Sequence, residues 1–148
     1  MRQRLPEVTV VSDGSCREQN GGYAALLQCN DVFHVVYGNS AETTNNRMEL
    51  LGAISALEKL QTTCKVRLVS DSRYVVDGLK SLPTWMNSGW RTQQGRPVAN
   101  QDLWERLQAQ KIRHSISPVW VKGHNGCPEN ELVDWFASAA NIPVGSAK

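Results

Sequence analysis

The sequence lacks the features that mark membrane, secreted and zinc-binding proteins. No run approaches the ~18 consecutive apolar residues of a membrane-spanning helix, and residues 1–6 have no apolar stretch typical of a signal peptide. Because the four cysteines include no C-x-x-C pair, we expect free thiols rather than disulfides or a zinc site at Cys16, Cys29, Cys64 and Cys127. These absences favour a cytoplasmic protein with no membrane anchor.

The net charge is also small. The net charge is only +2 over 148 residues, which by itself does not indicate a nucleic acid partner. Acids are absent from Gly78 to Gln101, however, where Lys80, Arg91 and Arg96 make a mildly positive stretch. The length and the 41% of hydrophobic residues suit one globular domain over residues 1–148, with a core from about 8 to 140 and a frayed polar tail.

The periodicity predicts three short strands followed by helices that alternate with strands. We expect strands at 7–12, 23–29, 32–38, 66–70 and 115–121. Helices are expected over 43–61, 71–82 and 100–112, and after Pro128 near the end of the chain. Pro83 should end the second helix, and three tryptophans should lie in the core: Trp104, Trp120 and Trp135. This order predicts an α/β fold with helices on the faces of a mixed five-stranded sheet.

Four acids stand next to apolar positions. Asp13 and Asp71 each follow an apolar strand, and neighbouring strands can carry such side chains to one edge of a sheet. Glu49 lies beside core positions of the first helix, and Asp134 lies between two apolar residues of the last. Half-buried acids are costly unless they are paired or bind metal. Each also has an ordinary alternative, because aspartates often begin turns and acids on helices are often solvated.

Converging carboxylates suit one kind of chemistry. Hard cations such as Mg²⁺ prefer oxygen ligands and share their remaining positions with water and substrate phosphates. Two such ions, about 3.5–4 Å apart, stabilise the attacking and the leaving oxygen of a displacement at phosphorus. If the four acids meet, they therefore predict a metal site for reactions at a phosphate.

Specific strings follow one another along the chain: SDGSC (12–16), GGYAALL (21–27), TTNNRMELLGAISALE (43–58), SDSRYVVDG (70–78), GWRT (89–92), RPVANQDLWERL (96–107) and WVKGHNGCPENELVD (120–134). In this order and spacing they resemble the type 1 ribonuclease H family, from about Val8 to Ala140. TTNNRMEL and WVKGH are the most specific. The resemblance implies the ribonuclease H-like sheet order 3-2-1-4-5. It also implies endonucleolytic cleavage of the RNA strand of an RNA/DNA hybrid, leaving 5′-phosphate and 3′-hydroxyl ends.

The resemblance also implies roles for single residues. It places the catalytic, metal-binding acids at Asp13, Glu49, Asp71 and Asp134, with two Mg²⁺ ions, or Mn²⁺ in their place. His124 matches the family's mobile histidine, which moves protons or helps to release product. The complete set of acids implies a competent site.

Substrate contacts are implied at a second group of positions. Asn45 and Asn46 match amides that read the RNA 2′-hydroxyl, because an amide both donates and accepts. Thr44 and Asn100 match a pocket for a phosphate of the DNA strand. The alternative for these two residues is helix capping.

Tyr74, Trp85 and Trp90 match an aromatic and basic protrusion beside the DNA strand, with packing as the alternative for the tryptophans. The protrusion departs from the family because it retains only Arg91 and Arg96 of several basic residues. Each phosphate contact that is missing should lower the salt dependence of binding by about one unit. We therefore predict weaker hybrid binding than in strongly basic relatives.

Two more departures lie near the predicted site. Glu42 stands two residues before Thr44, where relatives often carry arginine, and an acid there should repel a phosphate. The loop after Asp13 is about two residues shorter than the usual family version. Asn20 can replace the family asparagine of that loop.

Two other functions are compatible with the same residues. An integrase, transposase or junction resolvase has a similar sheet and acid cluster, but it acts on DNA and has no need of Asn45 and Asn46. A non-catalytic or weakly catalytic hybrid-binding module is the second alternative, and the complete acid set argues against it. No association surface is evident, so we expect a monomer without an obligate protein partner.

Overall fold

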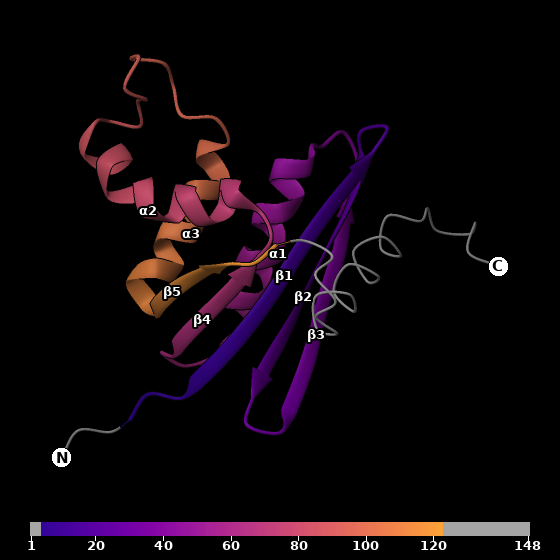
Figure 1. Ribbon diagram of the computed structural model, residues 1–148. Helices are drawn as coiled ribbons and strands as arrows, with labels where there is room; N and C mark the ends of the chain where they lie inside the picture. The colour runs from indigo at the N-terminus through magenta and orange to yellow at the C-terminus, as the bar shows by residue number, and fades with distance from the viewer. Residues whose placement is uncertain (1–3, 123–148) are drawn as a thin grey trace.

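A five-stranded sheet with three helices packed against it forms the part of the chain, residues 4–122, that the computed structural model describes (Figure 1). The elements are β1 (Glu7–Arg17), β2 (Asn20–Cys29), β3 (Val32–Ser40), α1 (Asn45–Lys59), β4 (Lys65–Ser70), α2 (Arg73–Asn87), α3 (Gln101–Arg113) and β5 (Ser115–Trp120). The sheet order is β3-β2-β1-β4-β5, which confirms the predicted mixed sheet. The expected last helix, with His124, Cys127, Asp134 and Trp135, lies outside the described residues.

The first two strands form a longer hairpin than the sequence suggested. β1 continues to Arg17 and β2 begins at Asn20, because their antiparallel pairing extends to the last residue on each side. Glu18 and Gln19 make the turn with positive φ angles of 54° and 69°, which matches the twist of the two strands. The expectation that the first strand ends before Asp13 was therefore wrong.

The main core lies between the sheet and the three helices. Trp104 of α3 is fully buried there, as predicted. A Cβ on Gly78 would collide with its ring, so the glycine lets α2 lie directly against the indole. The rings of Tyr74 and Trp85 pack on the same indole, with centroids 5.5 and 5.3 Å away. Two turns at opposite ends of α2 are thus tied to α3 through one buried side chain.

Pro83 lies inside α2 and does not end it. The helix runs on to Asn87, which corrects the expected end at residue 82 and adds four residues of the segment 84–99 to the helix. A proline has no N–H to donate to the carbonyl four residues earlier, that of Leu79. The ammonium of Lys111 on α3 lies 3.4 Å from this carbonyl oxygen and donates to it instead.

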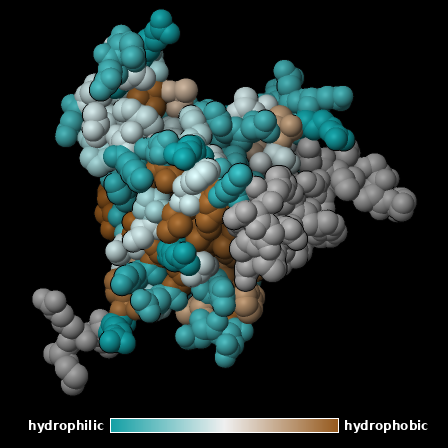
Figure 2. All heavy atoms as spheres, in the orientation of Figure 1, coloured by the Kyte–Doolittle hydropathy of each residue, from teal (hydrophilic) through white to brown (hydrophobic). Residues whose placement is uncertain are grey.

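The opposite face of the sheet carries a smaller apolar cluster of Val11, Ala24, Leu26 and Val69. These side chains alternate with those that face the helices, as expected because successive side chains of a strand point to opposite faces of the sheet. In the space-filling view apolar residues gather over the sheet, whereas the tip of the loop after α2 is hydrophilic (Figure 2). No helix of the described part of the chain is long and apolar enough to cross a membrane.

Candidate active site

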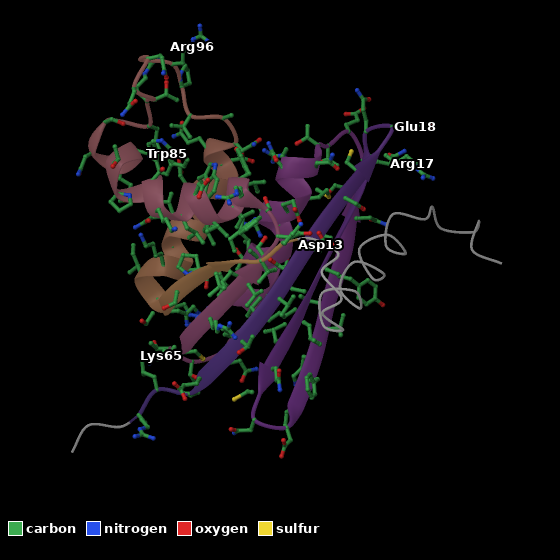
Figure 3. All side chains as sticks on the ribbon, in the orientation of Figure 1. Asp13, Arg17, Glu18, Lys65, Trp85 and Arg96 are labelled. Atoms are coloured by element: carbon green, nitrogen blue, oxygen red, sulfur yellow. The ribbon has the colours of Figure 1, made fainter. Side chains whose placement is uncertain are left out.

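β1 and β4 bring two aspartates together. Ser12 of β1 pairs with Ser70 of β4 in the parallel ladder. The residues that follow this pair, Asp13 and Asp71, therefore lie side by side on neighbouring segments of the chain. At this point β4 ends, and the hydroxyl of Ser72 caps α2. β1 continues past the same point, so Asp13 lies within a strand, near the middle of the sheet (Figure 3).

α1 approaches β1 closely because glycines occupy the contact points. A Cβ on Gly14 would collide with the backbone that joins Met48 to Glu49. A Cβ on Gly52 would lie 2.9 Å from the carbonyl oxygen of Asp13. Only glycine allows this approach without a shift of the helix. The close contact carries the Glu49 side chain to Asp13.

The three carboxylates form one cluster. One ligand oxygen from each of Asp13, Glu49 and Asp71 lies within 4.8 Å of the other two, and all three residues are half-buried. Burial, followed by the negative charges of Asp13 and Asp71, raises the pKa of Glu49 to about 10. At neutral pH and without a cation, Glu49 therefore keeps its proton and shares a hydrogen bond with Asp13. The backbone N–H of Gly14 donates to Asp13 Oδ1 at 2.9 Å.

This donor set fits a hard divalent cation. Carboxylate oxygens are the ligands that Mg²⁺ and Mn²⁺ take in proteins. Oε1 of Glu49 is buried and has no hydrogen-bond partner. Burial of an unpaired oxygen costs free energy, and coordination of a cation by this oxygen would remove that cost. A cation would also replace the proton that the crowded carboxylates hold. The cluster can therefore bind metal through Asp13, Glu49 and Asp71, whereas Asp134 lies outside the described residues.

Comparisons with known proteins agree with this site. The sequence model of the RNase H family matches residues 6–142. The chain belongs to the ribonuclease H family. It is 48% identical over 136 residues to Ribonuclease H of Xanthomonas campestris pv. campestris, covering 90% of this chain and 91% of that protein. It is 47% identical over 137 residues to Ribonuclease H of Nitratidesulfovibrio vulgaris, covering 90% and 88% of the two chains.

One solved structure places the chain in the same family, and another shares its fold. LC9-RNase H1, described as a type 1 RNase H with the type 2 active-site motif, superposes with a TM-score of 0.85 at 30% identity. The match covers 95% of this chain and 74% of that one. The N-terminal RNase H domain of rv2228c from Mycobacterium tuberculosis shares the fold, with a TM-score of 0.71 at 23% identity and 92% and 94% of the two chains covered. The chain is thus a ribonuclease H enzyme by family.

The start of α1 presents three residues predicted to bind substrate. Thr44 is the N-cap, and its hydroxyl accepts the N–H of Arg47 at 3.2 Å, so the capping alternative holds. Asn45 and Asn46 are the first two residues of the helix, and both are exposed. Their amides lie one turn before Glu49 and are accessible to a ligand of this ribonuclease H.

Asn100 does not cap α3 with its side chain. Its backbone is left-handed, with φ 60°, and it makes no cap hydrogen bond. Instead Asn100 Oδ1 accepts from Arg47 Nη1 at 3.2 Å, and Nδ2 donates to the Tyr74 hydroxyl at 2.8 Å. Arg47 also donates to both carboxylate oxygens of Asp102, at 3.0 and 2.7 Å. Two residues predicted to bind substrate, Asn100 and Tyr74, are thus joined in one network.

The tryptophans of the predicted protrusion are packed. Trp85 meets Trp104 edge to face at an interplanar angle of 64°, and Trp90 packs against the same core. The loop between them and α3 carries Arg96 at its tip (Figure 3). The guanidinium of Arg91 donates to the carbonyl of Gly95 at 3.2 Å. Packing therefore accounts for these contacts of the tryptophans, and their contact with substrate stays a prediction.

Sequence patterns missed two residues of this region. No pattern around Arg47 indicates its role, because its partners Asn100 and Asp102, at the start of α3, lie more than fifty positions away in the sequence. Trp120 was expected in the core, but it is 39% exposed and donates to the Asp71 carbonyl oxygen at 3.1 Å. The alternation in 115–121 fits either face of a strand, so it gives no signal for this position.

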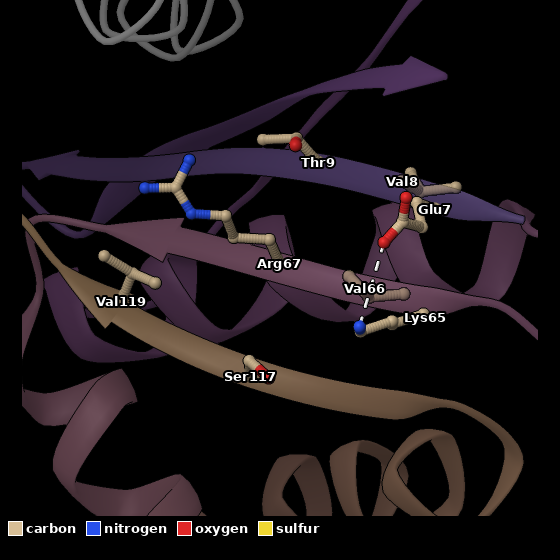
Figure 4. A pocket seen from close by; sticks show the side chains of 8 residues that line it. All are labelled: Glu7, Val8, Thr9, Lys65, Val66, Arg67, Ser117 and Val119. Carbon is tan, nitrogen blue, oxygen red and sulfur yellow. Dashed lines mark ion pairs between the residues drawn. The ribbon is translucent and has the colours of Figure 1, made fainter. Parts of the chain in front are cut away.

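A pocket of about 410 Å³ lies elsewhere on the sheet. Arg67, Thr9 and Ser117 are among its lining residues, and Lys65 pairs with Glu7 at 3.7 Å beside it (Figure 4). It is located toward the beginning of β4, whereas Asp71 follows the end of that strand. The pocket is therefore separate from the carboxylate cluster.

Proposed function

We propose that this ribonuclease H hydrolyses the RNA strand of RNA/DNA hybrids with two divalent cations, leaving 5′-phosphate and 3′-hydroxyl ends. The observation that carries the proposal is the cluster of Asp13, Glu49 and Asp71, whose ligand oxygens lie within 4.8 Å of one another. Mg²⁺ is the expected metal and Mn²⁺ a substitute. We further propose that residues 1–148 form one domain that acts as a cytoplasmic monomer.

The carboxylates supply the fixed ligands of the reaction. Divalent cations, when bound, activate a water and neutralise the charge on the leaving sugar oxygen. Asp13 is held by the Gly14 N–H and by the β1 ladder, and Asp71 follows directly on β4. Glu49 would bind a cation in its charged form, because a positive charge would oppose the effect of its acidic neighbours on its pKa. These residues would hold the cations beside the phosphate that is cut.

Two residues outside 4–122 complete this proposal. Asp134 is proposed as the fourth carboxylate ligand. His124 is proposed to move a proton or to assist product release. Both assignments rest on the family resemblance of WVKGHNGCPENELVD.

Recognition of a hybrid is proposed for the surface beside the cluster. RNA differs from DNA by its 2′-hydroxyl, which faces the wide minor groove. The exposed amides of Asn45 and Asn46 are suited to this group, because each both donates and accepts. Thr44 and Asn100 are proposed to bind a DNA-strand phosphate, and Tyr74, Trp85 and Trp90 to border that strand.

A cleavage assay tests the proposal. Purified protein is incubated with a labelled hybrid, duplex DNA, duplex RNA or single-stranded RNA, in Mg²⁺, Mn²⁺ or EDTA, and the product ends are mapped. We expect cleavage only of the RNA in the hybrid, and only with metal. Asp13→Asn should abolish it, whereas Asp77→Asn, an exposed acid on α2, should not. If wild type and Asp13→Asn are both inactive, the proposal is contradicted. Cleavage of duplex DNA alone would favour an integrase-like nuclease.

A further inference from the structure

Trp120 stands at the edge of the carboxylate cluster. It is the last residue of β5 and pairs with Ser70 of β4, one residue before Asp71. Its indole N–H donates to the Asp71 carbonyl oxygen at 3.1 Å, and the N–H of Val121 donates to the Ser70 carbonyl oxygen at 3.0 Å. The first bond holds the ring against the turn that carries Asp71, and the second continues the pairing of the two chain segments, while part of the ring remains exposed.

The guanidinium of Arg73 stacks on the ring of Trp120. Its carbon atom lies 4.1 Å from the centroid of Trp120, a distance typical of a cation–π contact. The ion pairs among residues 4–122 are Arg47–Asp102, Lys65–Glu7 and Arg106–Glu58, so Arg73 pairs with none of the described acids. Stacking uses the flat face of a guanidinium and leaves its N–H donors, which lie in the plane, directed outward.

The position of Arg73 does not stabilise its own helix. It is the first residue of α2, whose first turn holds no acid. A cation at a helix N-terminus is unfavourable, because the helix dipole is already positive there. The combined positive charge of Arg73 and the helix end lies next to the turn that holds Asp71.

We propose that Arg73, held in place by Trp120, binds a backbone phosphate of the strand that the carboxylate cluster cuts. The proposal rests on the proposed function. A polyanionic strand is repelled by three carboxylates unless cations lie beside them, and a fixed guanidinium presents paired donors that match a phosphate. Trp120 acts as a positioning residue, because it keeps the guanidinium beside the cluster instead of in an ion pair with a described acid.

Salt-dependent kinetics test the contact. KM and kcat for hybrid cleavage are measured over a series of salt concentrations for wild type, Arg73→Gln and Arg73→Lys. We expect Arg73→Gln to raise KM about three- to tenfold at low salt with little change in kcat. The slope of log KM against log salt should fall by about one unit. Arg73→Lys should retain most of the slope but not the full affinity, because lysine is a point charge without the planar fork.

Arg67→Gln is the matched control. Arg67 is exposed, lies on β4 and takes part in no ion pair among the described residues, but it lines the pocket away from Asp71 (Figure 4). Arg67→Gln removes the same charge as Arg73→Gln but at a distance from the cluster. KM and the slope of log KM against log salt should therefore stay at the wild-type values. An equal loss in Arg67→Gln would assign the effect to overall charge and overturn the proposal, as would an unchanged slope in Arg73→Gln.

Trp120 variants separate positioning from folding. Trp120→Leu removes the ring and should lower the salt slope as Arg73→Gln does, whereas Trp120→Phe keeps an aromatic face and should preserve it. A merely structural role of Trp120 would change the melting temperature but not the slope. The Asp13→Asn substitution should prevent cleavage, so in that background the salt dependence of hybrid binding can be measured directly. If wild type does not cleave, the proposed function fails, and an unchanged binding slope in Arg73→Gln overturns the phosphate contact independently.

Discussion

Glu49 of α1 shares a hydrogen bond with Asp13 of β1, and the pair can form only because Gly14 and Gly52 let the helix touch the strand. The proton in this bond has a consequence for stability. The pKa of Glu49 is about 10 in the folded protein, against an ordinary value of 4.5. The folded state therefore binds this proton more tightly than the unfolded chain does.

The first prediction concerns the pH dependence of the metal-free protein. The stabilisation from the Glu49 proton is complete below about pH 4.5 and is lost as the pH rises toward about 10. In EDTA, the melting temperature of wild type should therefore fall from about pH 6 to about pH 9 more steeply than that of Glu49→Gln, which has no such proton to lose. Thermal melts followed by circular dichroism measure this. The exposed control Glu58→Gln should keep the wild-type slope.

Addition of Mg²⁺ should raise the melting temperature of wild type more than that of Glu49→Gln. Metal binding stabilises the state that binds it, so wild type should gain thermal stability while Glu49→Gln gains less and loses activity. Parallel pH slopes for wild type and Glu49→Gln in EDTA would contradict the assigned pKa shift.

The second prediction concerns Gly52. Gly→Ala in a helix interior normally stabilises by about 0.8–1 kcal/mol. Here the new Cβ would lie 2.9 Å from the Asp13 carbonyl oxygen and 3.1 Å from that of Ala24, so α1 must shift. We expect Gly52→Ala to destabilise by about 1–3 kcal/mol and to lower kcat, because Glu49 moves with the helix. Urea unfolding and hybrid cleavage measure the two effects. Ser55→Ala is the control, and a stabilised Gly52→Ala would refute the prediction.

The strands and helices were predictable because their periodicity is local, whereas the sheet order was implied by the resemblance to the ribonuclease H family. Two errors had long-range causes. Pro83 remains inside α2 because Lys111, on another helix, takes up the carbonyl that the proline leaves free. β1 passes Asp13 because its pairing with β2 continues after its pairing with β4 has ended. Neither partner can be recognised from the residues next to the error.

The candidate site was predictable in its acids but not in their support. Asp13 lies within β1 and Asp71 directly follows β4, and the Ser12–Ser70 pair places the two aspartates together as expected. Glu49 depends on a helix contact that spacing alone does not specify. The roles of Arg47 and Trp120 come from partners distant in sequence, so only the three-dimensional structure reveals them.

The third prediction compares two arginine pairs between α1 and α3. Arg47–Asp102 and Arg106–Glu58 both have shortest contacts of 2.7 Å and are partly exposed, so each should contribute less than about 1 kcal/mol to stability. Only Arg47 also bonds to Asn100. Arg47→Ala should therefore raise KM for the hybrid about two- to tenfold, whereas Arg106→Ala should not. Steady-state kinetics measure this, and an equal KM in both variants would contradict a role for the network in substrate binding.

The fourth prediction concerns Glu42, an exposed acid with φ 53° two residues before Thr44. An acid at this point repels the phosphate that Thr44 and Asn100 are proposed to bind. Glu42→Arg should therefore lower KM for the hybrid and steepen its salt dependence by about one unit, as expected for one added phosphate contact. The backbone should tolerate the change, since neither residue is favoured over the other at positive φ.

Asp31→Arg controls for overall charge in the same experiment. Asp31 is exposed in the turn between β2 and β3, and its replacement changes the net charge by the same amount. If electrostatic attraction at long range dominates, both variants should improve KM equally. If a local phosphate contact is missing in this chain, only Glu42→Arg should do so, and its gain should disappear at high salt, where counterion release no longer favours the contact.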